Sequence, residues 1–191
     1  MTLDRQLAEA VFARAVLIVE GRTDAGFLQG IADRTGGFDA DGIAVVFGMG
    51  KTQLPIPWAI LAELGIPTYV LFDGDAALPQ RLASEGKSAD DLERARADVA
   101  SANRLLLGAL GAPVEDHPET RVEETFAVLQ DNLETEAAAW DDYLAELKRC
   151  QDELGDRRGK SEDVYRLAAS RTPVDPPAVF RDIILAVRRL A

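Results

Sequence analysis

The segment VLIVEGRTD at residues 16–24 decides the fold, together with TYVLFDGD at residues 68–75. Each segment is an apolar run, typical of a buried β-strand, that stops abruptly at carboxylates. In an open parallel sheet, ligands lie outside the carboxyl ends of the strands. Acids gathered at one such edge would repel one another. The usual remedy is a divalent cation with oxygen ligands, most often magnesium.

The two segments supply four acids for such a site. Glu20 ends the first strand and Asp24 opens the next helix, while Gly21 lets the backbone turn tightly between them. Asp73 and Asp75 alternate along an extended backbone, so both should point to the same side. The alternative for the first pair is a surface glutamate and a helix N-cap, and for the second an ordinary Asp-Gly turn.

Apolar periodicity around these segments predicts alternating strands and helices. An amphipathic helix precedes the first strand, and further helices separate the three strands from one another. This order is typical of an α/β protein with a parallel sheet flanked by helices. The predicted helices lie at about 3–12, 23–36 and 57–64, and the predicted strands at about 15–20, 43–47 and 68–72.

The chain changes character after residue 75 and is expected to be mostly helical from there. We therefore expect an α/β core over residues 1–118 and a mostly helical C-terminal subdomain over residues 119–191 that completes the site. The predicted elements are helices at 89–110, 122–130, 134–153, 160–170 and 177–190, with a short strand at 112–114.

The composition restricts the class of protein. The 191 residues carry a formal net charge of −12, which argues against a nonspecific nucleic-acid coat or a membrane-surface protein. A nucleic-acid enzyme is not excluded, because bound metals and local basic clusters supply positive charge where it is needed. Cys150 is the only cysteine, so neither an internal disulfide nor a cysteine zinc site can form. With no secretory signal and no membrane-length apolar stretch, we expect a cytoplasmic protein without a membrane partner.

Lys51 is the first basic candidate for a contact to nucleic acid. It follows Gly50 after the second predicted strand, but a complete phosphate-binding loop would need a glycine where Val45 stands. Lys51 could still touch a backbone phosphate of a substrate. The alternative is a plain turn.

The second half of the chain offers two further groups. Arg157, Arg158 and Lys160 are the densest basic group, suited to phosphate contacts or to a catalytic cation. The alternative is a solvated loop. Glu123 and Glu124 begin a predicted helix and could add a metal ligand, although acids are also favoured in the first turn of any helix.

Glu-Gly-x-x-Asp at residues 20–24 and Asp-x-Asp at residues 73–75 together resemble the Toprim module of topoisomerases, primases and several nucleases. The wider pattern narrows this resemblance. A helix leads into the first motif, a Gly-Lys pair at 50–51 follows the second strand, and a mostly helical remainder follows the second motif. The chain thus resembles the C-terminal nuclease region of the OLD (overcoming lysogenization defect) family, best over residues 10–76.

The resemblance implies a Toprim-like Rossmannoid parallel sheet and cleavage of DNA with two Mg²⁺ or Mn²⁺ ions. Glu20 and Asp24 would bind one ion, and Asp73 and Asp75 the other. These ions would make the chain a metal-dependent endonuclease.

The resemblance also implies contributions from the second half of the chain. Glu124 or Glu123 would complete the metal ligands, and Lys160 would stabilise the transition state. Family members carry an ABC-type ATPase domain ahead of this region, so we expect such a partner domain, absent from this chain. Two alternatives remain, a non-catalytic Toprim module that holds a metal or nucleotide and a Toprim RNA-processing nuclease.

Overall fold

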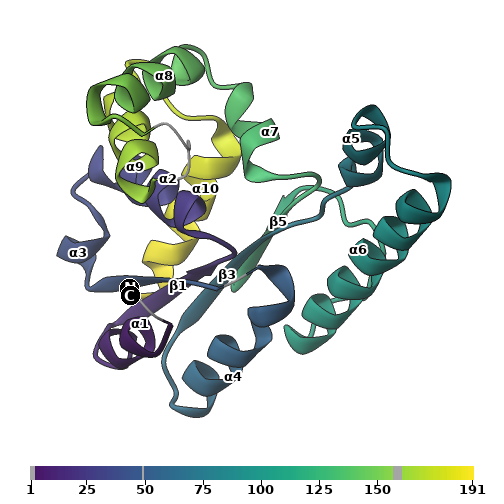
Figure 1. Ribbon diagram of the computed structural model, residues 1–191. Helices are drawn as coiled ribbons and strands as arrows, with labels where there is room; N and C mark the ends of the chain where they lie inside the picture. Colours follow the sequence, from purple (N-terminus) through teal and green to yellow (C-terminus); the bar gives the residue numbers. More distant parts are fainter. Residues whose placement is uncertain (1–2, 49, 157–160) are drawn as a thin grey trace.

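A computed structural model describes residues 3–48, 50–156 and 161–191, and shows a central sheet with helices on both faces (Figure 1). Within these residues the sheet has five strands in the order β2-β1-β3-β5-β4. The strands are β1 (Ala15–Val19), β2 (Ile43–Phe47), β3 (Thr68–Asp73), β4 (Arg121–Val122) and β5 (Phe126–Leu129).

The sheet is mainly parallel. β2, β1, β3 and β5 run in the same direction, and β4 at the edge pairs antiparallel with β5. Val19 pairs with Phe47, and Asp73 pairs with Leu129, so the carboxyl ends of the four parallel strands lie at one edge. The predicted α/β class with a parallel sheet is confirmed, and so are the three strands predicted in the first half.

Helices cover both faces because each strand presents alternate side chains to opposite sides of the sheet. None of the helices in the described residues is both long enough and apolar enough to cross a membrane. The helices are α1 (Leu3–Ala10), α2 (Arg22–Asp33), α3 (Phe38–Asp41), α4 (Pro55–Glu63), α5 (Leu78–Ser84), α6 (Ala89–Ala109), α7 (Leu133–Ala138), α8 (Tyr143–Leu154), α9 (Glu162–Arg171) and α10 (Ala178–Leu190), with a short 3-10 turn, η1 (Lys51–Gln53).

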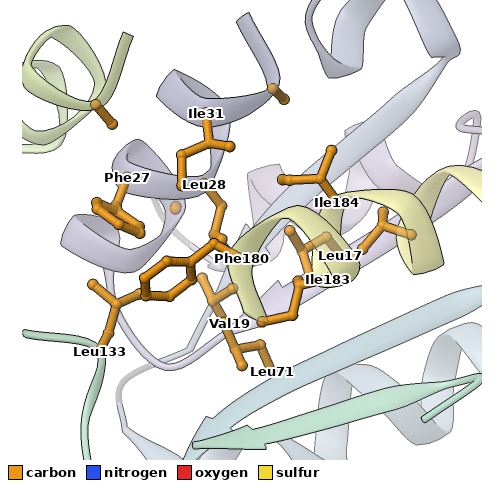
Figure 2. Packing of buried hydrophobic residues seen from close by; sticks show 14 of the residues in the cluster. Leu17, Val19, Phe27, Leu28, Ile31, Leu71, Leu133, Phe180, Ile183 and Ile184 are labelled. Atoms are coloured by element: carbon orange, nitrogen blue, oxygen red, sulfur yellow. The ribbon is translucent and has the colours of Figure 1, made fainter. Parts of the chain in front are cut away.

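Two apolar cores result, one on each face. Leu17 and Val19 of β1 belong to a core that includes α2, α9 and α10. Figure 2 shows Phe27 of α2 against Phe180 of α10 in this core, with ring centroids 4.8 Å apart in an edge-to-face arrangement. Ile18 faces the other way, into a core closed by α4 and α6. The sheet is therefore buried on both faces, as expected for parallel strands.

α2 and α9 lie in unusually close contact. A Cβ atom added at Gly26 would lie 2.2 Å from the carbonyl oxygen of Glu162, and one added at Gly30 would lie 2.2 Å from that of Arg166. Only glycine permits the two helix backbones to approach this closely. The contact holds the C-terminal helices against α2, whose first turn carries Asp24.

Three predictions for the second half are wrong. Residues 122–130, predicted as a helix, form most of the β4–β5 hairpin, and residues 112–114, predicted as a strand, have no regular structure. The apolar run of β5 is fully buried, and a short run of this kind does not distinguish a buried strand from a helix. The helix predicted at 134–153 is two helices, α7 and α8, with Asp142 between them at a φ of 66°.

The position of β5 bears on the expected boundary between the core and the C-terminal subdomain at residue 118. β5 lies in the sheet between β3 and β4, so residues beyond 118 contribute to the sheet as well as to the C-terminal helices. The later predicted helices are found as α6, α9 and α10, while α3 and α5 were not predicted.

Candidate functional site

The carboxyl ends of β1 and β3 bring Glu20 and Asp73 together. Glu20 directly follows β1, and Asp73 is the last residue of β3. The backbone N–H of Asp73 donates a hydrogen bond of 2.9 Å to Glu20 Oε1. The N–H of Gly50 donates to the carbonyl oxygen of Glu20 at 3.2 Å, which holds the loop after β2 at the same edge. Two acids predicted from separate segments are therefore neighbours.

Asp24 lies in the first turn of α2. Its Oδ2 accepts a hydrogen bond of 2.9 Å from the backbone N–H of Gly21, and the hydroxyl of Thr23 donates to Oδ1 at 3.4 Å. Asp24 thus helps to cap the helix, as the simpler interpretation held. Its charge also raises the pKa values of Glu20 and Asp73, so it belongs to the same group of carboxylates.

Burial and mutual repulsion disfavour the charged forms of these three acids. Burial raises the pKa of Glu20 from 4.5 to about 7 and that of Asp24 from 3.8 to about 6. Burial, followed by the charge of Glu20, holds the pKa of Asp73 well above its usual value. In the described part of the chain, no lysine or arginine forms an ion pair with any of the three. Among the described residues the group therefore has no ion-paired cation, although the charge of Lys51 partly offsets the rise in the pKa of Glu20.

The donor set suits a hard divalent cation, because it offers carboxylate oxygens in a partly buried setting. Across residues 3–48, 50–156 and 161–191, however, no three acidic, histidine or cysteine side chains converge closely enough to hold an ion as they stand. A bound ion would require the carboxylates to turn toward a common point.

Asp75 has a different environment. The extended strand ends at Asp73, and Asp75 has a φ of 56°, so the two aspartates do not alternate along one strand as predicted. Asp75 Oδ2 accepts a hydrogen bond of 2.7 Å from Lys51 Nζ, and Asp75 Oδ1 lies 3.7 Å from Arg81. Gly74 between them donates from its N–H to Leu129 at 2.6 Å, so the ends of β3 and β5 are in close contact.

Lys51 was predicted as a phosphate contact, and the structure buries it. Its side chain is 7% exposed, and its ammonium donates to Asp75 and, at 3.0 Å, to Asn103 Oδ1. Two of its three N–H groups thus have acceptors within the protein.

Glu123 and Glu124 are not brought to this edge. They lie between β4 and β5, ahead of Phe126, which pairs with Val70 near the beginning of β3. The hydroxyl of Tyr69 donates to the carbonyl oxygen of Glu123 at 3.2 Å, at the amino end of β3. The prediction that either glutamate completes the site is wrong, because residues 122–130 form a hairpin and not a helix.

The predicted phosphate contacts Arg157 and Arg158, and the predicted catalytic Lys160, lie outside the described residues. α8 ends at Leu154 before them, and α9 begins at Glu162 after them.

The acid that the sequence interpretation missed is Glu134. It lies in the first turn of α7, a few residues after the carboxyl end of β5, and its charge raises the pKa values of Asp24 and Asp73. Burial, and then the charges of Glu134 and Asp24, raise the pKa of Tyr165 on α9, so α9 also lies beside this group.

Asp131 was missed as well. It is 9% exposed, and its Oδ1 accepts a hydrogen bond of 3.0 Å from the N–H of Ala77. Its Oδ2 accepts from Arg81 at 2.5 Å and from the hydroxyl of Thr135 at 2.9 Å. Asp131 follows an apolar strand just as Glu20 and Asp73 do, and this repeated pattern was the signal that could have found it.

Comparison with known proteins agrees with this fold. Residues 11–75 match the family described as "Overcoming lysogenization defect protein-like, TOPRIM domain". The C-terminal region of the Xanthomonas campestris pv. campestris OLD protein superposes with a TM-score of 0.60 at 17% identity, over 93% of this chain and 95% of that one. The same region of the Burkholderia pseudomallei OLD protein gives a TM-score of 0.57 at 20% identity, over 94% and 100%. A search of curated protein sequences gave no match.

These comparisons confirm the resemblance predicted from the sequence. The matched family segment ends at Asp75 and contains all four acids of the two motifs. The superpositions extend the shared fold over nearly the whole chain.

Proposed function

We propose that this chain is a metal-dependent DNA endonuclease that hydrolyses phosphodiester bonds. The proposal rests on the OLD-like TOPRIM match and on a fold like that of the C-terminal regions of OLD proteins. The observation that carries the proposal is the group formed by Glu20, Asp24 and Asp73. Three partly buried carboxylates with raised pKa values, and no basic partner among the described residues, lie at the edge of the sheet where α/β proteins bind ligands.

The carboxylates would suit a divalent cation once their side chains turn toward a common point. Glu20 and Asp24 each accept a backbone N–H at one oxygen, from Asp73 and Gly21 respectively, which orients the side chain. The other oxygen of Glu20 would be available to a metal, and that of Asp24 accepts only a long hydrogen bond from Thr23. Glu134 is the nearby acid best placed to add a further oxygen. A divalent ion would supply Lewis-acid activation of a water molecule and stabilisation of charge on the scissile phosphate.

The acids of this chain would perform two tasks. A bound cation would favour their ionised forms, which burial disfavours in its absence. The acids would also fix where the scissile phosphate lies, because a chain with a net charge of −12 repels a polyanion except where a cation is held. Arg157, Arg158 and Lys160 remain proposed phosphate contacts, with Lys160 as the cation for the transition state.

DNA is proposed as the substrate from the OLD-like match, and an ABC-type ATPase domain as a partner. A nicking assay on supercoiled plasmid DNA with Mg²⁺ or Mn²⁺ tests the proposal. Glu20→Gln and Asp24→Asn should each lower the nicking rate at least about 100-fold, on the scale of losing one charge-stabilising group. Asp98→Asn, on the exposed side of α6, is the matched control and should cut like the wild-type protein.

Assays of the purified wild-type chain also distinguish the alternative functions. Metal binding without cleavage of DNA or RNA would favour the non-catalytic module. Preferential cleavage of structured RNA in a mixture with DNA would favour the RNA-processing nuclease. Wild-type rates in both acid variants would reject the assignment of the site.

A further inference from the structure

A cation lies near each carboxylate oxygen of Asp75. Lys51 Nζ donates to Oδ2 at 2.7 Å, and Arg81 lies 3.7 Å from Oδ1. The side chain of Lys51 is 7% exposed and that of Asp75 is 25% exposed, so water competes little for this pair. Asp75 therefore has its countercharge within the fold.

The position of Lys51 is fixed by a buried asparagine. Asn103 of α6 is fully buried, and its Oδ1 accepts from Lys51 at 3.0 Å. Its amide nitrogen donates to the carbonyl oxygens of Gly74 at 3.0 Å and Asp116 at 2.9 Å. These two bonds leave only the amide oxygen to face the ammonium. Moving Lys51 away would leave both a buried acceptor and a buried charge without a partner.

Positive and negative charges are balanced around Asp75, whereas acidic charge is in excess around Glu20, Asp24 and Asp73. Asp75 and Asp131 face Lys51 and Arg81, and the Arg81–Asp131 pair is 2.5 Å long. Glu20, Asp24 and Asp73 form no ion pair with a described lysine or arginine, although the charge of Lys51 also lowers the pKa of Glu20. A divalent cation placed at Asp75 would add two positive charges beside two that are already there.

We infer that the Lys51 ammonium is the resident cation of Asp75, so that this chain binds one divalent ion, at the Glu20, Asp24 and Asp73 group, and not two. The inference rests on the proposed metal site and departs from the two-ion arrangement implied by the family resemblance. Lys51 acts here as a positioning residue. It donates a hydrogen bond to Asp75 and provides its countercharge, and one N–H group remains that has no acceptor in the described protein.

Counting the bound ions tests this inference directly. Mn²⁺ is titrated into the purified chain at about 0.15 M salt, where weak surface binding is screened, and free Mn²⁺ is followed by electron paramagnetic resonance. The wild-type chain should bind one ion. Asp75→Asn should still bind one ion, and Asp73→Asn should bind none. Lys51→Met should gain a second ion, while Lys87→Met, at an exposed position outside the site, should remain at one.

The outcomes separate this inference from the proposed function. Two ions on the wild-type chain, falling to one in Asp75→Asn, would overturn the inference and leave the metal-dependent function intact. No ion on the wild-type chain would reject the metal site itself. Circular dichroism establishes that each variant is folded. The wild-type and Asp75→Asn counts decide the question even if Lys51→Met does not fold.

Discussion

Replacing Glu20 by glutamine should stabilise the metal-free protein above neutral pH. The pKa of Glu20 rises from 4.5 to about 7 on folding, chiefly because the carboxyl group is buried. Each pKa unit corresponds to about 1.4 kcal/mol, so full ionisation of this carboxylate costs the folded state about 3 kcal/mol. Glutamine has nearly the same shape and keeps an oxygen for the Asp73 N–H, but it carries no charge.

The sign follows from proton binding. Between the unfolded and folded pKa values, the folded protein holds a proton on Glu20 that the unfolded chain has lost. The contribution of Glu20 to stability therefore falls as pH rises from 4.5 to about 7, and the full cost is present above that range. Asp24 and Asp73 act in the same direction, since their pKa values are also raised.

Urea unfolding of the wild-type and Glu20→Gln proteins in EDTA measures this effect. The free energy of unfolding of the variant should exceed that of the wild type by about 3 kcal/mol at about pH 8, and the two should agree at about pH 4. Glu63→Gln on the exposed side of α4 serves as the control and should show no such difference. If Glu20→Gln gains no stability at the higher pH, the carboxylate is not buried without a counter-ion, and the electrostatic reasoning fails.

The remaining predictions concern packing, the buried asparagine and the metal. Gly26→Ala should lose at least about 1–3 kcal/mol in urea unfolding, because the new Cβ would lie 2.2 Å from a carbonyl oxygen of α9. Gly108→Ala, where α6 is exposed, should gain about 0.5–1 kcal/mol, and equal effects of the two changes would contradict the close helix contact. Asn103→Leu should lose about 1–3 kcal/mol because Lys51 loses a buried acceptor, and an unchanged unfolding curve would show that this acceptor is dispensable. Mg²⁺ at about 100 times its dissociation constant should stabilise the wild-type protein by about 2.7 kcal/mol in thermal unfolding, and a similar gain in Asp73→Asn would place the ion elsewhere.

The sequence predicted the first half of the fold well because two local signals agree there. The runs at 16–19 and 68–72 are apolar on both faces, and helical periodicity separates them, so both the element type and the parallel pairing follow. The acids at their ends then have to meet, because parallel strands end at one edge of the sheet. Glu20 and Asp73 are neighbours for this reason.

The second half was predicted less well because its apolar run is short and because its important contacts join residues that are far apart in the sequence. The run at 126–129 is only four residues long, and interpreting it as a helix puts Glu123 and Glu124 in a first turn. The structure instead brings the charge of Glu134 to bear on Asp24 and Asp73. Asn103 lies within a helix of 21 residues, where nothing local indicates that it contacts Lys51 and Gly74 across the fold. The positive φ of Asp75 also depends on contacts with the end of β5.

Cleavage of supercoiled plasmid DNA by the wild-type chain and by Asp73→Asn, each with and without Mn²⁺, tests the central claim most directly. We expect nicking by the wild-type chain only when the metal is present. We also expect that Asp73→Asn, though folded, loses at least about 100-fold in rate under the same conditions. Metal-independent nicking, or an undiminished rate in Asp73→Asn, would contradict a metal-dependent site at the carboxyl edge of the sheet.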